Sequence, residues 1–339
     1  MQLRINYIDS IKGIAIIFMV IGHSIQYGNG KFYLMNNAFF ENPFFEFIYS
    51  FHMPLFMIIS GYLFYISSEK HSPSIIVQKK LKRYILPFIS YSIIALFISN
   101  YKYIIDGYFF IIAKNIIHEI IFGYHLWFLK SLIINILIIQ ITKYFITDNI
   151  IIYGLIAVSF LFIPDTSIMA IYKFLFPFFI LGYYFRKYNC RFPLHIFLTF
   201  LFLIVYFYLI RFWNNSYYIY TTGYYILRPS ISYYLSIDII RFIIGLSGSI
   251  IVSTLIYYSD KYFYRITNQT LAFIGKRTLG IYCIQGFILH IYRNITQDII
   301  IEYNYQNVIL CFLITFCGSL SLTLAFERSK ILSKYFLGQ

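Results

Sequence analysis

Charged side chains are scarce in this chain. They make up 12% of its 339 residues, whereas 60% of the residues are hydrophobic and the mean hydropathy is +0.71. A water-soluble domain surrounds its core with charged and polar side chains, and it cannot bury this much apolar surface. The scarcity of charge therefore excludes a soluble globular protein and predicts an integral membrane protein.

Cysteine and acidic residues are also few. The four cysteines have no paired spacing, which argues against a disulfide framework and against a bound metal. Asp and Glu number 13 against 27 Lys and Arg, so the net charge is +14. No basic stripe lies on a soluble domain. The excess of Lys and Arg therefore indicates the topology of the chain in the membrane, and we expect no nucleic-acid partner. The cysteines are Cys190, Cys283, Cys311 and Cys317.

Long apolar runs are what the chain has in abundance. Runs of about 16 to 23 residues can cross a ~30 Å hydrocarbon layer. We expect the first run to remain as a span, since no small-residue cleavage site follows it, and we expect no detached soluble domain. The prediction is one all-α transmembrane domain over 1–339 with about ten spans, at about 8–27, 44–66, 84–101, 124–145, 149–164, 168–185, 193–213, 238–258, 270–291 and 305–326.

The positions of lysine and arginine predict the orientation of these spans. Cytoplasmic loops carry an excess of Lys and Arg. With both termini inside the cell, most of the 27 basic residues fall on the inner side of the lipid bilayer. These inner residues are Arg4, Lys12, Lys70, Lys79, Lys80, Lys82, Arg83, Lys143, Arg186, Lys187, Arg191, Lys261, Arg265, Lys276, Arg277, Arg328, Lys330 and Lys334.

Two connections between the spans are longer than turns. In the first, about 102–120, Lys102, Asp106, Lys114 and His118 recur at multiples of four and share one stripe of an otherwise apolar segment. We expect an amphipathic helix on the outer membrane interface there. The second, about 213–237, is rich in tyrosine, which suits stacking on sugar rings and also the ordinary membrane interface. The sequence leaves both readings open.

The first span holds two titratable residues, Lys12 and His23. Such side chains are costly in lipid, so a span that keeps them indicates a functional site. Eleven helical steps of about 100° bring His23 to within roughly 20° of the face of Lys12, about 16 Å away along the axis. One wall of the helix therefore presents a cation near its inner end and an imidazole near its outer end.

Other polar residues lie at the same outer depth on separate spans. Polar side chains inside a membrane usually face one another around a water-filled cavity. A basic cluster precedes the third span on the inner side, so the pattern predicts a path from a cationic inner mouth to an outer histidine site. The outer residues are His23, Glu46, His52, Trp127, Lys130, Asp238 and Arg241, and the inner ones are Lys79, Lys80, Lys82 and Arg83.

Motifs along nearly the whole chain carry a family resemblance. They are RINYIDSIKGIAIIFMVIGHS (4–24), FHMPLFMIISGYLF (51–64), LKRYILPF (81–88), HLWFLKSL (125–132), FFILGYYFRK (178–187) and IGKRTLGIYCIQ (274–285). In this order they resemble the acyltransferase-3 family of membrane acyltransferases, which includes sugar O-acetylases of bacterial surface polysaccharides. The resemblance implies ten spans and a bacterial cytoplasmic membrane.

The resemblance also implies roles for single residues. The family hallmark, a basic residue and an essential histidine separated by ten positions, falls on Lys12 and His23, and its R-x-x-R element falls on Lys80 and Arg83. Both motifs begin with lysine here, which keeps the charge but not the bidentate contact of arginine. The late motif commonly ends in histidine, whereas this chain has Gln285, to which we assign no chemistry.

Together, the residues and the resemblance predict transfer of acetyl from cytosolic acetyl-CoA to a sugar hydroxyl of a cell-surface or lipid-linked polysaccharide. His23 would take the hydroxyl proton or carry the acyl group, and no metal is expected. The polyanionic donor would bind Lys12, Lys80, Arg83 and Arg4. The predicted supporting or acceptor-binding residues are Asp9, Ser24, His52, Trp127, Lys130, Arg228 and Arg241.

Other interpretations remain open at this point. A transporter or flippase of lipid-linked glycans also needs a polar cavity, but neither a repeat of spans nor paired helices broken by Gly or Pro is evident. A polysaccharide polymerase usually needs a larger outer loop than 213–237. For single residues, the alternatives are membrane anchoring by Lys12, Lys80, Arg83 and Trp127, helix capping by Asp9, and a kink at His52 and Pro54.

Overall fold

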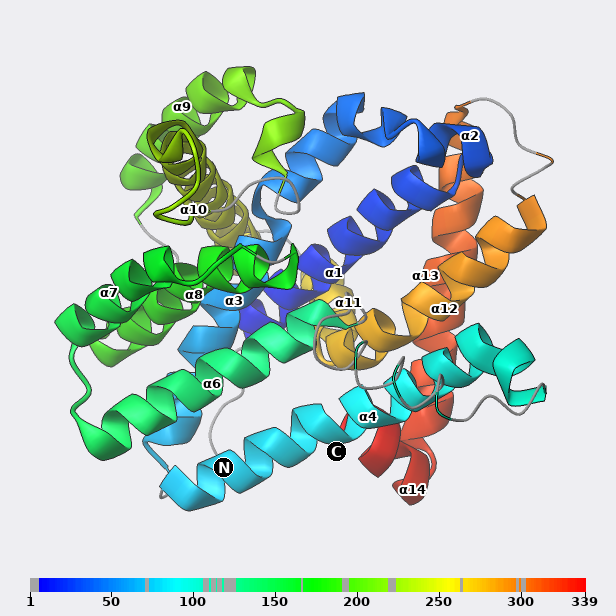
Figure 1. Ribbon diagram of the computed structural model, residues 1–339, viewed down its shortest axis with the longest axis horizontal. Helices are drawn as coiled ribbons and strands as arrows, with labels where there is room; N and C mark the ends of the chain where they lie inside the picture. Colours follow the sequence, from blue (N-terminus) through cyan, green and yellow to red (C-terminus); the bar gives the residue numbers. More distant parts are fainter. Residues whose placement is uncertain are drawn as a thin grey trace.

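The computed structural model describes residues 6–70, 73–105, 110, 114, 118, 126–165, 167–190, 195–218, 224–262, 265–296, 299 and 303–339. Within these ranges all regular elements are helical and no strand is present, which confirms the all-α prediction. Figure 1 shows the helices as an inclined bundle, with the short helix α14 (Lys330–Leu332) at its lower edge.

The helices follow the apolar runs of the sequence. Long helices are joined by short 3-10 turns, labelled η, and the chain ends in a short π-helical turn, η5. The elements are α1 (Asn6–Tyr27), α2 (Gly30–Met35), η1 (Ala38–Glu41), α3 (Pro43–Ser68), α4 (Pro73–Ile105), α6 (Trp127–Phe145), α7 (Ile150–Ser159), η2 (Phe160–Phe162), α8 (Ser167–Lys187), α9 (Ile196–Leu209), η3 (Ile210–Phe212), η4 (Asn215–Tyr217), α10 (Ile231–Tyr262), α11 (Arg265–Gly275), α12 (Thr278–Thr296), α13 (Tyr305–Glu327), α14 and η5 (Ser333–Leu337).

Seven of the described helices are long and apolar enough to cross a membrane: α1, α3, α4, α6, α8, α10 and α13. The other three predicted spans are shorter or broken in the structure. The ranges 149–164 and 193–213 correspond to the shorter apolar helices Ile150–Phe162 and Ile196–Phe212. The range 270–291 is interrupted by a turn at 276–277, between α11 and α12. The chain is thus a helical multi-pass membrane protein, and the count of ten spans stays a prediction.

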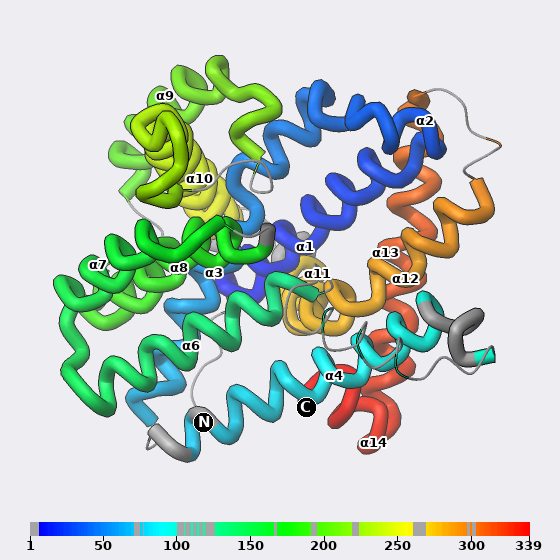
Figure 2. Tube along the Cα trace, viewed as in Figure 1, coloured from blue at the N-terminus to red at the C-terminus, as the bar shows by residue number. Residues whose placement is uncertain are grey.

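Close backbone contacts hold the helices that carry the site. Helix α3 packs extensively on α8, and α1 packs on α11 (Figures 1 and 2). A Cβ on Gly61 of α3 would lie 2.0 Å from the carbonyl oxygen of Phe179 on α8, and a Cβ on Gly13 of α1 would lie 2.1 Å from that of Leu271 on α11. Glycine alone lets the backbones approach this closely, as small residues do between membrane helices.

Part of the Tyr-rich connection forms regular structure. Its first part contains η4, and Trp213, Tyr217 and Tyr218 are buried there in a hydrophobic cluster with residues of η1 and α3. At its other end α10 begins at Ile231, seven residues before the expected start of the span. These three aromatic side chains therefore pack inside the protein, a position that neither the sugar-stacking nor the membrane-interface interpretation predicts.

Most of the predicted amphipathic helix at about 102–120 lies outside the described residues. Helix α4 continues into the start of this range and ends at Ile105. Beyond it the described residues are Phe110, Lys114 and His118, all of which are exposed. The interfacial helix accordingly stays a prediction, as does any role for Asp106.

The start of α1, the start of α4 and the end of the chain lie on one side of the bundle. Lys12 of α1 lines the same cavity as Lys80 and Arg83 of α4. Gly338, with φ of +64°, lies against Arg83, and a Cβ there would meet the Arg83 carbonyl oxygen at 2.0 Å. These three segments therefore share one side of the bundle, and its assignment to the cytoplasm stays a prediction.

We therefore expect a reporter fused after Gln339, and an epitope tag inserted in the connection between α3 and α4, to be cytoplasmic. The reason is the excess of Lys and Arg on this side of the bundle. Alkaline phosphatase and green fluorescent protein fusions measure this location. Phosphatase activity from the fusion after Gln339 would contradict the orientation and the route of a cytosolic donor with it.

Candidate active site

A cavity with a cationic end lies between α1, α3, α4, α6 and α12. It encloses about 950 Å³, including the open space at its mouth, and its cations are Lys12, Lys80 and Arg83. Met19, seven residues after Lys12 on α1, lies on its wall. Because seven residues advance the helix by about 10 Å, the cavity extends well beyond its charged end. We call it the inner cavity.

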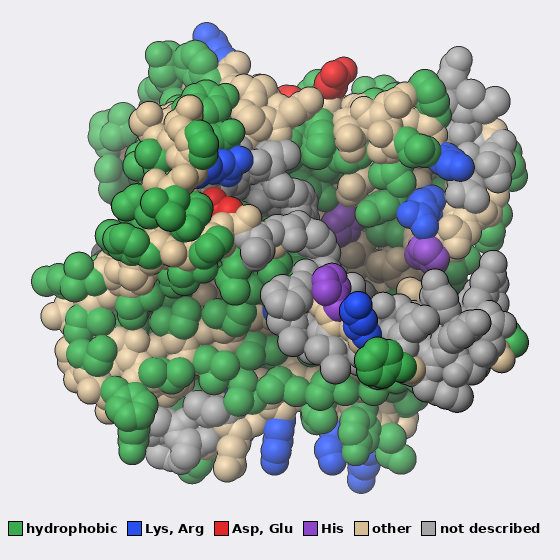
Figure 3. Space-filling model, in the orientation of Figure 1, with side chains coloured by type: hydrophobic (Ala, Val, Ile, Leu, Met, Phe, Trp, Pro, Cys, Tyr) green, Lys and Arg blue, Asp and Glu red, His purple; other side chains and the backbone are tan. Residues whose placement is uncertain are grey.

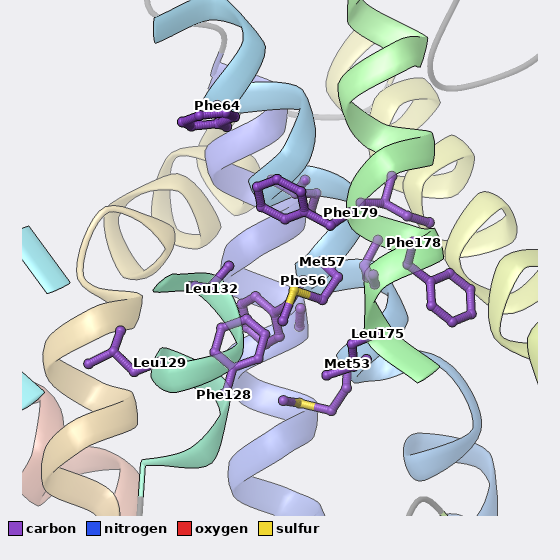
Figure 4. Close-up of a cluster of buried hydrophobic side chains, with 14 of the residues drawn as sticks. Met53, Phe56, Met57, Phe64, Phe128, Leu129, Leu132, Leu175, Phe178 and Phe179 are labelled. Atoms are coloured by element: carbon purple, nitrogen blue, oxygen red, sulfur yellow. The ribbon is translucent and has the colours of Figure 1, made fainter. Parts of the chain in front are cut away.

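Apolar side chains form most of the remaining wall of the inner cavity. Figure 4 shows many of them gathered between the helices. Methionine and aromatic side chains share this wall with leucine and isoleucine, and such walls accept a flexible, uncharged chain more readily than a charged one. The residues of Figure 4 that line the cavity are Met53, Phe56, Phe64, Phe128, Leu129, Leu132 and Phe179.

The three cations of the inner cavity differ in their partners. Lys12 Nζ lies 2.7 Å from Asp9 Oδ1 one turn earlier, and both side chains are mostly buried. Asp9 thus pairs with Lys12, in addition to placing a negative charge in the first turn of α1. No ion pair joins Lys80 or Arg83 to a carboxylate among the described residues. The mouth therefore keeps a net positive charge suited to an anion.

A second pocket lies on the other side of Tyr282 and contains His23. It encloses about 820 Å³ of space open to its surroundings, between α1, the start of α6 and α12, and we call it the outer pocket. Figure 3 shows a hollow on the face of the molecule, with purple histidine and blue basic side chains at its edge. Its described lining residues are His23, Tyr27, Leu126, Trp127, Tyr282, Cys283, Gln285, Gly286, Leu289, His290 and Arg293.

The imidazole of His23 is held by Gln285. His23 Nδ1 lies 3.0 Å from Gln285 Oε1, and Gln285 is 5% exposed. An amide oxygen can only accept a hydrogen bond, so this contact requires the proton of the neutral imidazole on Nδ1. The lone pair is then on Nε2. Gln285 therefore fixes both the ring orientation and the tautomer that a general base needs.

Tyr282 borders both spaces. It lines both the inner cavity and the outer pocket, and its hydroxyl accepts a hydrogen bond of 3.2 Å from the Phe128 backbone N–H. Leu126, just before α6, has a left-handed φ of 49°, which is costly for a leucine. The consecutive residues Trp127 and Phe128 contribute to different spaces, Trp127 to the outer pocket and Phe128 to the inner cavity. Tyr282 is thus a described residue that the inner cavity and the outer pocket share, and a continuous path between them stays a prediction.

Several predicted supporting residues are near His23 without lining either space. His52 is 2% exposed, and its Nδ1 lies 2.7 Å from the Ile48 carbonyl oxygen. Ser24 is fully buried and donates to the Val20 carbonyl oxygen at 2.7 Å. Each of these side chains therefore makes its hydrogen bond to the backbone of its own helix. Trp127 does line the outer pocket, and Arg4 lies outside the described residues.

The remaining predicted residues belong to other contacts. Lys130 is 7% exposed and lies over the Phe88 ring, with its Nζ 5.5 Å from the ring centroid. Arg241 pairs with Asp238 one turn earlier and donates to the Tyr218 carbonyl oxygen at 3.1 Å. Arg228 stacks on Tyr234. None of these basic side chains lines the inner cavity or the outer pocket, so equal depth did not bring Lys130 or Arg241 to His23.

Sequence reasoning missed the residues of α12. Tyr282, Gln285, Leu289 and Arg293 recur at intervals of three and four and therefore share one helix face. Tyr282, Gln285 and Arg293 make this face polar within an apolar segment, which was a readable signal. The departure from the family histidine at position 285 obscured it, because a glutamine has no proton chemistry of its own. In the structure, that same residue contacts the histidine.

The sequence of this chain was compared with protein families, curated proteins and solved structures. Residues 5–328 match the acyltransferase domain family. The curated relatives include the nodulation protein NolL of Mesorhizobium japonicum, 31% identical over 185 residues, and NolL of Sinorhizobium fredii, 30% identical over 186 residues. These matches cover 53% of this chain and 47% and 48% of the two relatives, so the chain spans about half the length of each. No solved structure matches the chain.

Proposed function

Since this chain belongs to the acyltransferase domain family, we propose that it is a membrane O-acyltransferase that moves acetyl from cytosolic acetyl-CoA to a sugar hydroxyl of a cell-surface or lipid-linked polysaccharide. One observation supports this proposal above the others. An inner cavity with a cationic mouth and an outer pocket with an oriented histidine meet at one residue, Tyr282. A polyanionic donor and a hydroxylated acceptor can therefore approach each other from opposite sides.

The inner cavity suits the acyl donor. Its mouth offers Lys80 and Arg83 to phosphates, and its apolar walls suit the pantetheine arm. The axial distance from Lys12 to His23 on α1 is about 16 Å, which an extended arm can cover. Phosphate contacts at the mouth would thus bring the thioester to the boundary at Tyr282. Acetyl-CoA is a substrate in this scheme, and no metal takes part in it.

The outer pocket suits activation of the acceptor. In the tautomer that Gln285 requires, Nε2 of His23 removes the proton from the sugar hydroxyl as its oxygen attacks the thioester carbonyl carbon. A carbon–oxygen bond forms, the carbon–sulfur bond breaks, and the CoA thiolate takes the proton from the imidazolium. The products are an acetyl ester and free CoA, so atoms and charges balance without another reactant.

The direct test uses the full-length protein in lipid nanodiscs. Acetyl-CoA and a membrane extract that contains the glycan are added, and CoA release is followed with a thiol reagent while mass spectrometry follows the glycan. We expect acceptor-dependent CoA release together with a glycan heavier by one acetyl group. A flippase would move the glycan without releasing CoA, so glycan movement without thiol release would contradict the proposal.

We expect Lys80→Ala and Arg83→Ala to raise the KM for acetyl-CoA about tenfold, with a smaller loss of kcat. Their contact with the donor is remote from the reacting carbon, and such contacts contribute binding more than rate. Lys82→Ala is the matched control, because Lys82 lies on the same helix but lines neither space. An unchanged KM for acetyl-CoA in both variants, measured by steady-state kinetics, would contradict binding of the donor in the inner cavity.

A further inference from the structure

The outer pocket contains a cation that the acyl-transfer step does not use. Among its described lining residues, Arg293 alone carries a fixed charge, and none is acidic. Elsewhere in the described chain, most buried or half-buried cations pair with a carboxylate: Lys12 with Asp9, Lys143 and Lys187 with Asp148, Lys173 and Arg228 with Asp165, Arg241 with Asp238, and Arg277 with Glu327. No such pair forms for Arg293 within the described residues.

Neighbouring side chains of α12 hold the guanidinium of Arg293. Its Nη2 donates to His290 Nδ1 at 3.0 Å and to Asn294 Oδ1 at 3.4 Å, and His290 also lines the pocket. Its Nε is buried, and no described group accepts a hydrogen bond from it. A buried donor without an acceptor is costly. A planar guanidinium that lines a pocket offers the geometry that a carboxylate or phosphate group takes with two hydrogen bonds.

The place of Arg293 relative to His23 indicates where an anion would lie on the acceptor. Arg293 is eight residues beyond Gln285 on α12, which is about 12 Å along the axis. Tyr27, one turn beyond His23 on α1, lines the same pocket. The cation therefore lies outward of the imidazole, at a separation of one to two sugar units rather than within one ring.

We propose that the outer pocket selects an acceptor that carries an anionic group, a carboxylate or a phosphate, one or two sugar units from the hydroxyl that is acylated, and that Arg293 binds this group with His290 beside it. This inference rests on the proposed function and specifies its acceptor. A carboxylate would belong to an acidic sugar of the glycan. A phosphate would belong to the linkage of a lipid-bound or phosphorylated glycan.

A binding measurement tests the anion site without turnover. The chain has two tryptophans, and Trp127 lines the pocket whereas Trp213 is buried in another cluster. In a Trp213→Phe background, titration with three disaccharides should change the Trp127 fluorescence. The probes are one with a uronic acid, one with a phosphate, and a neutral one. We expect an anionic probe to bind about tenfold more tightly than the neutral one, and Arg293→Gln to abolish this preference.

The controls separate this inference from the proposed function. Arg211→Gln removes an exposed arginine of η3 that lines neither space, and it should leave the preference unchanged. Tighter binding of the uronic acid probe identifies a carboxylate, and tighter binding of the phosphate probe identifies a phosphate. Equal affinity for all three probes in the Trp213→Phe protein would overturn the anion site. An equal loss of affinity for all three probes when Arg293→Gln is added would overturn it as well. Acetyl transfer is not needed for either result, so a failure of acyltransfer is observed separately.

Discussion

His23→Gln is expected to lower kcat for acetyl transfer by about 10² to 10⁴. Glutamine keeps a polar side chain in the outer pocket, but it cannot take up the hydroxyl proton that the proposed step transfers to Nε2. The lone pair on Nε2 is available because Nδ1 binds Gln285 at 3.0 Å. The measurement is the initial rate of acceptor-dependent CoA release in nanodiscs, with glycan acetylation followed by mass spectrometry.

The donor should still bind to the His23→Gln protein. His23 lines the outer pocket and not the inner cavity, so the KM for acetyl-CoA should stay within about twofold of the wild-type value. His195→Asn is the matched control. His195 is the exposed N-cap residue of α9, and an asparagine can cap the helix in its place. A folded His23→Gln protein that acetylates its glycan at the wild-type rate would exclude proton transfer by this residue.

The fold could be predicted from the sequence wherever one physical rule dominates. Apolar runs in a chain with 12% charge must form helices in lipid, because every backbone group needs a partner there. Details that depend on tertiary contacts could not be predicted. The turn at 276–277 splits an apolar run, and Gly275, whose Cβ would lie 1.7 Å from the Asp9 carbonyl oxygen, fits α11 against α1 at that turn.

The candidate site was predictable in part for a similar reason. Helical periodicity placed Lys12 and His23 on one wall, and the structure has the first lining the inner cavity and the second the outer pocket. Depth alone was a weaker guide. Asp238 and Arg241 are three residues apart, so they neutralise each other on α10 without facing His23. A charged side chain that pairs with another on its own helix does not need a water-filled cavity. The depth of a residue in the membrane does not show whether it has such a partner.

Gln285 shows most clearly what the sequence could not supply. A carboxamide is uncharged and does not titrate, so its position on the polar face of α12 pointed to it more than its chemistry did, and that position does not reveal its partner. Its role depends on the atom it touches, and that contact joins residues 262 positions apart in the chain. Loop lengths and periodicity do not determine the rotation of α12 about its axis, which decides whether residue 285 or a neighbouring one meets α1.

Gln285→Leu is expected to lower kcat about 10- to 100-fold while the KM for acetyl-CoA stays nearly constant. The substitution leaves the Nδ1–H of His23 without its acceptor, and an unmade hydrogen bond of a buried group costs about 1 to 3 kcal/mol. The imidazole can then adopt the other tautomer or turn away from the hydroxyl. Steady-state kinetics of CoA release separates the loss of kcat from any change in KM.

Rescue by a residue that can accept the same hydrogen bond distinguishes this positioning role from simple packing. Gln285→His should restore most of the lost rate, because an imidazole nitrogen can accept from His23 Nδ1. A packing role would instead follow side-chain shape, so leucine would be tolerated about as well as histidine. Equal kcat values for Gln285→Leu and Gln285→His would show that the contact between Gln285 and His23 does not position the base, and catalysis would then depend on His23 without a fixed tautomer.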